Sequence, residues 1–177
     1  MISFMYCMSQ ETFVPVLQTL SLILDKASHH AESKKIDPAV LVNARLAPDM
    51  FPLKQQVQIA CEMAKACMAR LSGAEPPARD DMGESFAELK QRIESAIGYV
   101  QSLGEASFEG AADRAIAFPL IDKLVYESNG LQFLRDWTLP HFYFHVVTVY
   151  DILRHNGVEL SKRDYMSHVS YAMRERG

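Results

Sequence analysis

Helical periodicity runs through nearly the whole chain, and it limits the fold more than any other feature of the sequence. Apolar residues recur at steps of three and four positions, the spacing that places side chains on one face of an α-helix. The first such segment covers about residues 12–33, with Thr12 as the expected N-cap and Pro15 tolerated because it falls in the first turn. Its apolar stripe comprises Phe13, Val16, Leu17, Leu20, Ile23, Leu24, Ala27 and Ala31.

Three further amphipathic segments of similar length are expected, at about residues 52–72, 84–103 and 138–156. Each is followed by a glycine (Gly73, Gly104 and Gly157), the residue that most readily takes the left-handed conformation that ends a helix. Thr138 is the expected N-cap of the last of them.

Two short helices complete the helical pattern. Asp37 followed by Pro38 predicts an N-cap with proline at the first helical position, and hence a short helix over 38–44 between the first two long helices. Ser161 and Asp164 resemble a capping box and predict a short helix near the C-terminus.

Residues 105–130 are the least helical part of the chain. The stretches "AIAFPL" and "KLVYES" have some β character, so either a hairpin or an irregular crossover is expected before the fourth long helix. With no internal repeat and no long linker, the sequence predicts one domain over residues 1–177. Its expected class is all-α, an up-and-down four-helix bundle.

Composition excludes several functional classes. Of 177 residues, 49% are apolar and 23% charged, as in ordinary globular proteins, and the net charge of −4 argues against nucleic acid as a partner. The most apolar N-terminal run, residues 13–24, is too short and too polar to span a membrane. A secretory signal begins with basic residues, and none precedes Lys26, so no such signal is expected. Three cysteines without a CxxC motif favour a reducing compartment, so a cytoplasmic protein is expected.

His141 and His145 are the most suggestive chemical feature. They lie four positions apart, and at about 100° per residue they fall at the edge of the apolar stripe of the fourth long helix. Two imidazoles on adjacent turns can converge on one metal ion, but they supply only half of a zinc-type site, which needs at least three protein ligands. The other interpretation is that they donate hydrogen bonds to a polar neighbour across a helix contact.

The rest of the sequence carries no established catalytic motif: it has no GxSxG, no Walker loop and no dinucleotide-binding fingerprint. His29 and His30 lie in the last turn of the first helix, where an imidazole is favoured by the helix dipole.

Two long segments carry a resemblance to a known family. "DPAVLVNARLAPDMFPLKQQVQIA" and "LPHFYFHVVTVYDILRHNGVELSKRDY" resemble the uncharacterised, domain-of-unknown-function branch of the DinB-like superfamily, over nearly the whole chain to about residue 166. The resemblance implies an up-and-down bundle, a homodimer and a ligand pocket at one end. In metal-binding relatives a histidine of the second helix joins an HxxxH pair of the fourth. His141 and His145 match that pair, whereas the second helix has no histidine and offers Gln55, Gln58, Cys61 and Glu62.

His29 or His30 of the first long helix could take the place of the missing histidine. In an up-and-down bundle the end of the first helix meets the start of the fourth, so His29 or His30 is expected to approach His141. We therefore predict one polar pocket, with Asp49, Gln55, His141 and His145 as ligand-binding residues and with His141, His145 and His29 or His30 as metal ligands.

Two functions fit this prediction. One is a non-catalytic protein that binds a small ligand, without nucleic acid or membrane partners. The other is an enzyme that uses a divalent metal (Zn²⁺, Ni²⁺ or Fe²⁺) for thiol transfer or hydrolysis, an expectation that comes by family analogy alone.

Overall fold

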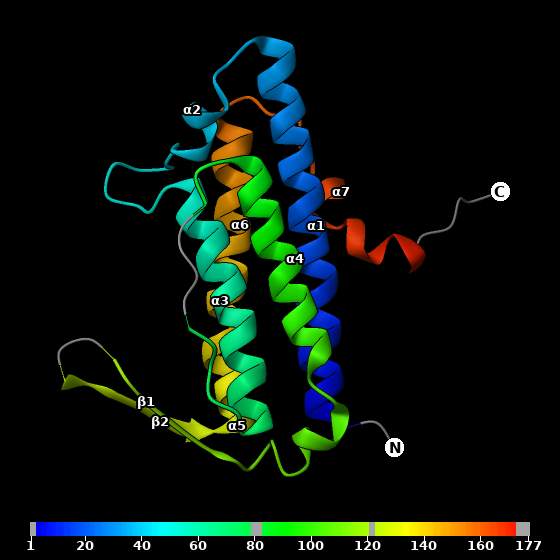
Figure 1. Ribbon diagram of the computed structural model, residues 1–177, viewed down its shortest axis with the longest axis vertical. Coiled ribbons are helices and arrows are strands. Elements are labelled where there is room, and N and C mark those ends of the chain that lie inside the picture. Colours follow the sequence, from blue (N-terminus) through cyan, green and yellow to red (C-terminus); the bar gives the residue numbers. More distant parts are fainter. Residues whose placement is uncertain (1–2, 79–82, 121–122, 173–177) are drawn as a thin grey trace.

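Within residues 3–78, 83–120 and 123–172, which the computed structural model describes, four long helices lie side by side (Figure 1). They are α1 (Phe4–Lys34), α3 (Leu53–Ser72), α4 (Phe86–Ser102) and α6 (Leu139–His155). Short helices α2 (Pro38–Val42) and α7 (Lys162–Tyr165) and the 3-10 segments η1 (Glu105–Phe108) and η4 (Ser167–Ala172) join or extend them. The fold is mostly helical, as predicted. It is not purely α-helical, however, because it also contains a small two-stranded sheet.

The helices do not follow the predicted up-and-down order, because α3 and α4 run in the same direction (Figure 1). An ion pair of 2.6 Å between Lys54 Nζ and Glu84 Oε2 joins the beginnings of both helices, and Lys90 near the start of α4 pairs with Asp25 near the end of α1. The connection 73–85 therefore returns along the bundle. Its 13 residues can span about 43 Å when extended, whereas α3 is only about 30 Å long. Consequently α1 and α6 also run in one common direction.

Helix α1 begins eight residues before the position predicted from the sequence. Met5 and Ser9 are buried and continue its apolar stripe towards the N-terminus, so Pro15 lies inside the helix rather than in its first turn. Thr12 is not an N-cap: its Oγ1 donates to the Met8 carbonyl at 2.6 Å. Packing of the stripe outweighs the backbone hydrogen bond that Pro15 cannot donate.

Several predicted helix ends are confirmed. Asp37 accepts a hydrogen bond from the Ala39 N–H at 2.9 Å and caps α2, and a capping box at Ser161 begins α7. Gly73 and Gly157 end their helices with φ values of 82° and 88°. Helix α4 differs, because it ends at Ser102 and Gly104 has an extended backbone with φ −74° and ψ 149°.

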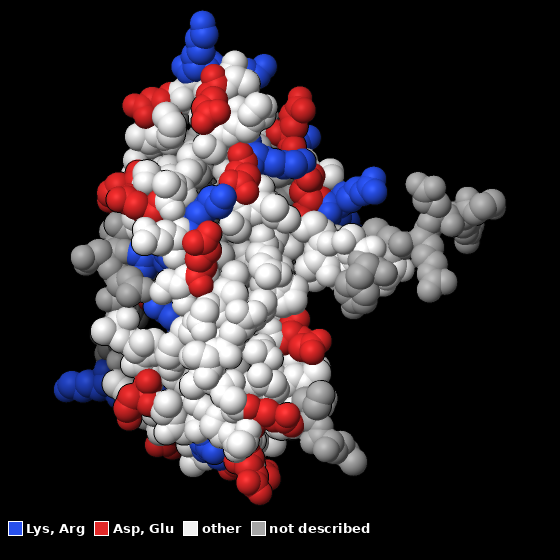
Figure 2. Space-filling view, turned by 45° about the vertical axis from the view of Figure 1, so that its right-hand side comes forward, with Lys and Arg blue, Asp and Glu red and all other residues white. Residues whose placement is uncertain are grey.

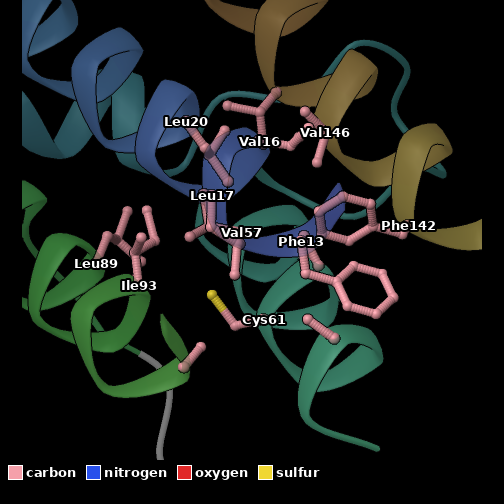
Figure 3. Packing of buried hydrophobic residues seen from close by; sticks show 14 of the residues in the cluster. Phe13, Val16, Leu17, Leu20, Val57, Cys61, Leu89, Ile93, Phe142 and Val146 are labelled. Atoms are coloured by element: carbon pink, nitrogen blue, oxygen red, sulfur yellow. The ribbon is translucent and has the colours of Figure 1, made fainter. Parts of the chain in front are cut away.

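The core fills the space between the four long helices. Phe13 of α1 and Phe142 of α6 meet edge to face at 5.0 Å between ring centroids, and buried side chains of α3 and α4 belong to the same core (Figure 3). No helix of the described residues is long and apolar enough to cross a membrane. On the face shown in Figure 2, basic and acidic side chains are interspersed, and no continuous basic surface forms there.

A β-hairpin extends from one end of the bundle, where a hairpin was one of the two expectations. Strand β1 (Ala115–Pro119) pairs antiparallel with β2 (Val125–Asn129), with Phe118 opposite Tyr126. The chain then passes through α5 (Gly130–Gln132) and the π-helical segment η3 (Phe133–Thr138) directly into α6. Thr138 was predicted to cap the fourth helix, but its helical backbone (φ −71°, ψ −51°) places it inside a continuous turn.

Candidate functional site

A buried hydrogen bond joins the histidine helix to α3. The Gln56 amide nitrogen donates to the Phe51 carbonyl at 3.0 Å, which turns the amide oxygen towards His145. His145 Nδ1 lies 2.6 Å from that oxygen and is therefore the protonated ring nitrogen. This assignment leaves Nε2 of His145 as the nitrogen with a free lone pair.

Burial also fixes the charge of His145. The side chain is 9% exposed, and desolvation lowers the pKa from 6.5 to about 4, with the nearby imidazole of His141 contributing less. His145 is therefore neutral at neutral pH. A neutral imidazole with one free lone pair can accept a hydrogen bond or bind a metal ion, but it is not an acid at that pH.

His141 lies one turn before His145, with 6.4 Å between the ring centroids. Its Nδ1 is buried and has no hydrogen-bond partner among the described residues, while its ring meets the edge of Trp137 at 4.6 Å. The pair is thus partly enclosed, with one polar atom unsatisfied.

The side chains around this pair do not fit the three-ligand metal site of the metal-binding relatives. Across the parts of the chain that the structure describes, no group of three or more His, Cys, Asp or Glu side chains gathers in a way that could hold a metal ion. The α3 side chain that reaches His145 is the amide of Gln56, a poor zinc ligand.

The predicted approach of His29 and His30 to His141 is wrong. His30 Cε1 lies 3.9 Å from the position that a Cβ atom on Gly157 would take, so these histidines meet the far end of α6. Gly157 follows His145 by twelve residues, about 18 Å along a helix. The cause is the common direction of α1 and α6. With Lys26, Val158 and Glu159, His29 and His30 instead line a separate pocket of about 550 Å³.

The other two predicted ligand residues do not join the histidines by any described contact. Asp49 is exposed in the connection between α2 and α3, and Gln55 is half-buried in the first turn of α3. Sequence analysis missed Gln56, although a signal was present. Gln56 follows Leu53 by three positions and precedes Ala60 by four, so it lies on the buried stripe of that helix.

A second hollow lies beside the histidine pair, between α3, the β-hairpin and η3. Its volume is about 470 Å³, within the range of small-molecule pockets. The residues that define its character are Glu62, Lys65, Ala66 and Arg70 of α3, Phe118 of β1, and Phe133, Trp137 and Thr138 of η3. We call this hollow the α3–hairpin pocket.

Aromatic rings form one side of the α3–hairpin pocket. Phe118 lies 5.9 Å from Phe133 and 5.6 Å from Trp137 between ring centroids, with edge-to-face geometry in both pairs. The Arg70 guanidinium carbon lies 4.5 Å from the centre of the Phe118 ring and 6.0 Å from that of Phe133. Burial lowers the pKa of Arg70, and the neighbouring Cys67 and Glu75 counteract this in part. The pocket therefore contains a cation held on an aromatic surface.

Two buried polar groups lie behind this surface. Burial raises the pKa of the Cys67 thiol to about 12, although the Thr138 hydroxyl beside it opposes the shift, so Cys67 is not a nucleophile at neutral pH. Thr138 is 1% exposed, and among the described residues its Oγ1 has no hydrogen-bond partner of good geometry.

Comparison with known proteins identifies the family. Residues 5–166 match the family model described as a domain of unknown function (DUF1993). The chain belongs to the DUF1993 family. The predicted resemblance to a domain-of-unknown-function branch of the DinB-like fold is thereby confirmed.

A solved structure agrees with this assignment. The crystal structure of a DinB family member protein from Shewanella denitrificans is 41% identical in sequence, with a TM-score of 0.85. The match covers 97% of this chain and 94% of that one. No protein in the comparison with curated proteins matches the chain.

Proposed function

We propose that this DUF1993 protein is a non-catalytic protein that binds a small molecule in the α3–hairpin pocket. The observation that carries the proposal is the composition of the pocket wall, in which the Arg70 guanidinium lies against aromatic rings that line a volume of about 470 Å³. A concave, largely apolar site with a few convergent polar groups is the usual form of a ligand pocket. The Cys67 thiol is too weakly acidic to act as a nucleophile at neutral pH. His145 is neutral, and its Nδ1–H is hydrogen-bonded to Gln56. Neither residue therefore supports a catalytic role.

The test uses Trp137, which is the only tryptophan of the chain and lines the pocket. A panel of small acids, amines and neutral compounds is titrated while Trp137 fluorescence and the thermal unfolding midpoint are recorded. At least one compound is expected to change both, saturably. Ala66→Phe, which fills the pocket from α3, should abolish that response. Ala87→Phe, on the exposed side of α4, is the matched control and should leave it intact. The proposal fails if no compound binds or if binding survives Ala66→Phe.

A second candidate is a divalent-metal-dependent enzyme that uses His141 and His145. The observation that favours it is the buried, unsatisfied Nδ1 of His141 beside a neutral His145. The α3 side chain that faces this pair is Gln56, whose amide is a poor metal ligand, so the site has only two histidine ligands. Elemental analysis of protein purified without a chelator or histidine tag tests the candidate. Stoichiometric metal that is lost in His141→Ala would favour the enzyme over the ligand-binding protein.

We also propose a cytoplasmic location and a homodimer. The three cysteines are free thiols, and Cys61 and Cys67 are buried, as expected in a reducing compartment. Phe144 and Val147 lie on one face of α6 and are 55% and 38% exposed, which supplies apolar surface for a second copy. Analytical ultracentrifugation of the wild type and of Phe144→Ser tests the dimer, which should dissociate more readily in the variant.

A further inference from the structure

Arg70 is an unneutralised cation in the wall of the α3–hairpin pocket. Its two ring contacts do not satisfy the five N–H donors of a guanidinium. Among the described residues it forms no ion pair, although Glu75 is near enough to affect its pKa. Desolvation already disfavours its charged form, so an anion entering the pocket would regain part of the lost solvation.

The other charged side chains of the pocket already have partners. Lys65 and Glu62 each have contacts of their own, and Glu62 accepts a hydrogen bond from Gln58 at 2.9 Å. Arg70 is therefore the cation with donors to spare. Its planar fork matches the two oxygens of a carboxylate better than a point charge does.

The Thr138 hydroxyl is a second donor on the same pocket. Thr138 lines the pocket, and its buried Oγ1 lies beside the Cys67 thiol but has no hydrogen-bond partner of good geometry among the described residues. Thr138 and Arg70 both line this one pocket. Sulfur is a weak acceptor, so a ligand oxygen that accepts from the Thr138 hydroxyl would be favoured.

The remaining wall suits a flat apolar group. Phe118, Phe133 and Trp137 form a mutually packed cluster, and Pro76 and Pro119 also line the pocket. A volume of about 470 Å³ lies towards the lower end of the range for ligand pockets, which suits a molecule of one or two rings.

From these contacts we infer that the ligand is a small planar aromatic carboxylate: Arg70 and Thr138 bind its carboxylate, and Phe118, Phe133 and Trp137 bind its ring. This inference rests on the proposed ligand-binding function and adds to it the chemical class of the ligand. A free aromatic acid is thus favoured over its amide or amine analogue.

Phenylacetate and phenylacetamide test the inference because they have nearly the same shape and differ in charge. Phenylacetate should change Trp137 fluorescence saturably, with an affinity at least about tenfold higher than that of the amide, the effect of one charge-assisted pair. Phenethylamine should bind more weakly than either.

Substitutions of Arg70 test whether this side chain causes the preference for phenylacetate over phenylacetamide. Arg70→Gln should lower phenylacetate affinity at least about tenfold and change phenylacetamide affinity by less than about twofold. Arg70→Lys should keep part of the preference, because it retains the charge but loses the planar fork. Arg154→Gln, on the exposed end of α6, is the matched control and should bind both probes as the wild type does.

The outcomes separate this inference from the proposed function. Equal affinities of the wild type for acid and amide would overturn the ligand class, and so would a preference for the acid that survives in Arg70→Gln. The ligand class would also be overturned if neutral compounds bind to the wild type but not to Ala66→Phe, while phenylacetate does not bind to the wild type. In each of these cases ligand binding itself stands. If no panel compound binds, both are wrong. The comparison within the wild type needs no variant and remains decisive if Arg70→Gln does not fold.

Discussion

The burial of His145 makes the free energy of unfolding depend on pH in a defined window. In the folded protein His145 has a pKa of about 4, whereas the unfolded chain restores the ordinary value of 6.5. Between these values the unfolded state binds a proton that the folded state does not bind. Stability from this residue is therefore fully present above about pH 6.5 and falls as the pH drops towards 4.

The size of the effect follows from the two pKa values. Relative to a pH well above 6.5, protonation of the unfolded chain at this one site costs about 0.8 kcal/mol at about pH 6 and about 2 kcal/mol at about pH 5. A loss of about 2 kcal/mol is a substantial part of the stability of an ordinary domain.

His145→Asn isolates this contribution because the asparagine amide can occupy the place of Nδ1–H and still donate to Gln56. Urea denaturation of wild type and variant is compared from about pH 7.5 to about pH 5. The variant should be less stable at neutral pH because it loses ring volume, but the difference between the two proteins should shrink as the pH falls. His155→Asn controls for the loss of an imidazole on the same helix, and its stability should follow the wild-type curve.

Two results would refute this reasoning. One is an equal loss of stability in the wild type and His145→Asn over the whole pH range. The other is a proton NMR titration in which the ring of His145 protonates near pH 6.5, since the contact with Gln56 and the surrounding burial would then have no effect on the imidazole.

Further substitutions test whether Gln56 prevents metal binding at the histidine pair, and whether Gly130 is needed in the turn that leads into η3. Gln56→His places a third imidazole beside His145, one turn from His141, so calorimetric titration should show tighter Zn²⁺ binding than in the wild type. Gln55→His, about 100° round the same helix, should show no gain, and equal gains would contradict the geometry. Gly130→Ala should destabilise the fold by several kcal/mol in thermal or urea unfolding, because its Cβ would lie 1.9 Å from the Ala111 carbonyl oxygen. Gly98→Ala, in open space on α4, should instead stabilise by about 0.5–1 kcal/mol, and similar effects at both glycines would refute the steric argument.

The helices were predictable from the sequence because their signals are local. Apolar spacing and the glycines at Gly73 and Gly157 define helices α3 and α6 to within a residue or two. The extension of α1 was not predicted, because Thr12 as N-cap places Pro15 in the first turn, whereas burial of Met5 and Ser9 outweighs the cost of a proline inside the helix. The direction of α4 was not predictable, since the length of the 73–85 connection permits either direction.

The site was less predictable, because its parts come from distant segments. The helical wheel placed His145 beside the core correctly, but Gln55 rather than the adjacent Gln56 was predicted as the pocket residue of the second long helix. No local spacing indicates that Arg70, Phe118 and Trp137 meet, since they lie on α3, the hairpin and η3. Only the tertiary arrangement reveals the α3–hairpin pocket.

The common direction of α3 and α4 has a consequence for how the chain folds. Because consecutive helices are not all antiparallel neighbours, α4 packs on α1 across about fifty intervening residues, and α3 packs on α6 across more than sixty. Contacts of high sequence separation slow folding, since long loops must close before they are repaid by burial. Helix α6 also leaves the ribosome after the other three long helices. The surface that α3 presents to α6, and with it the α3–hairpin pocket, is therefore completed only after synthesis of the C-terminal third.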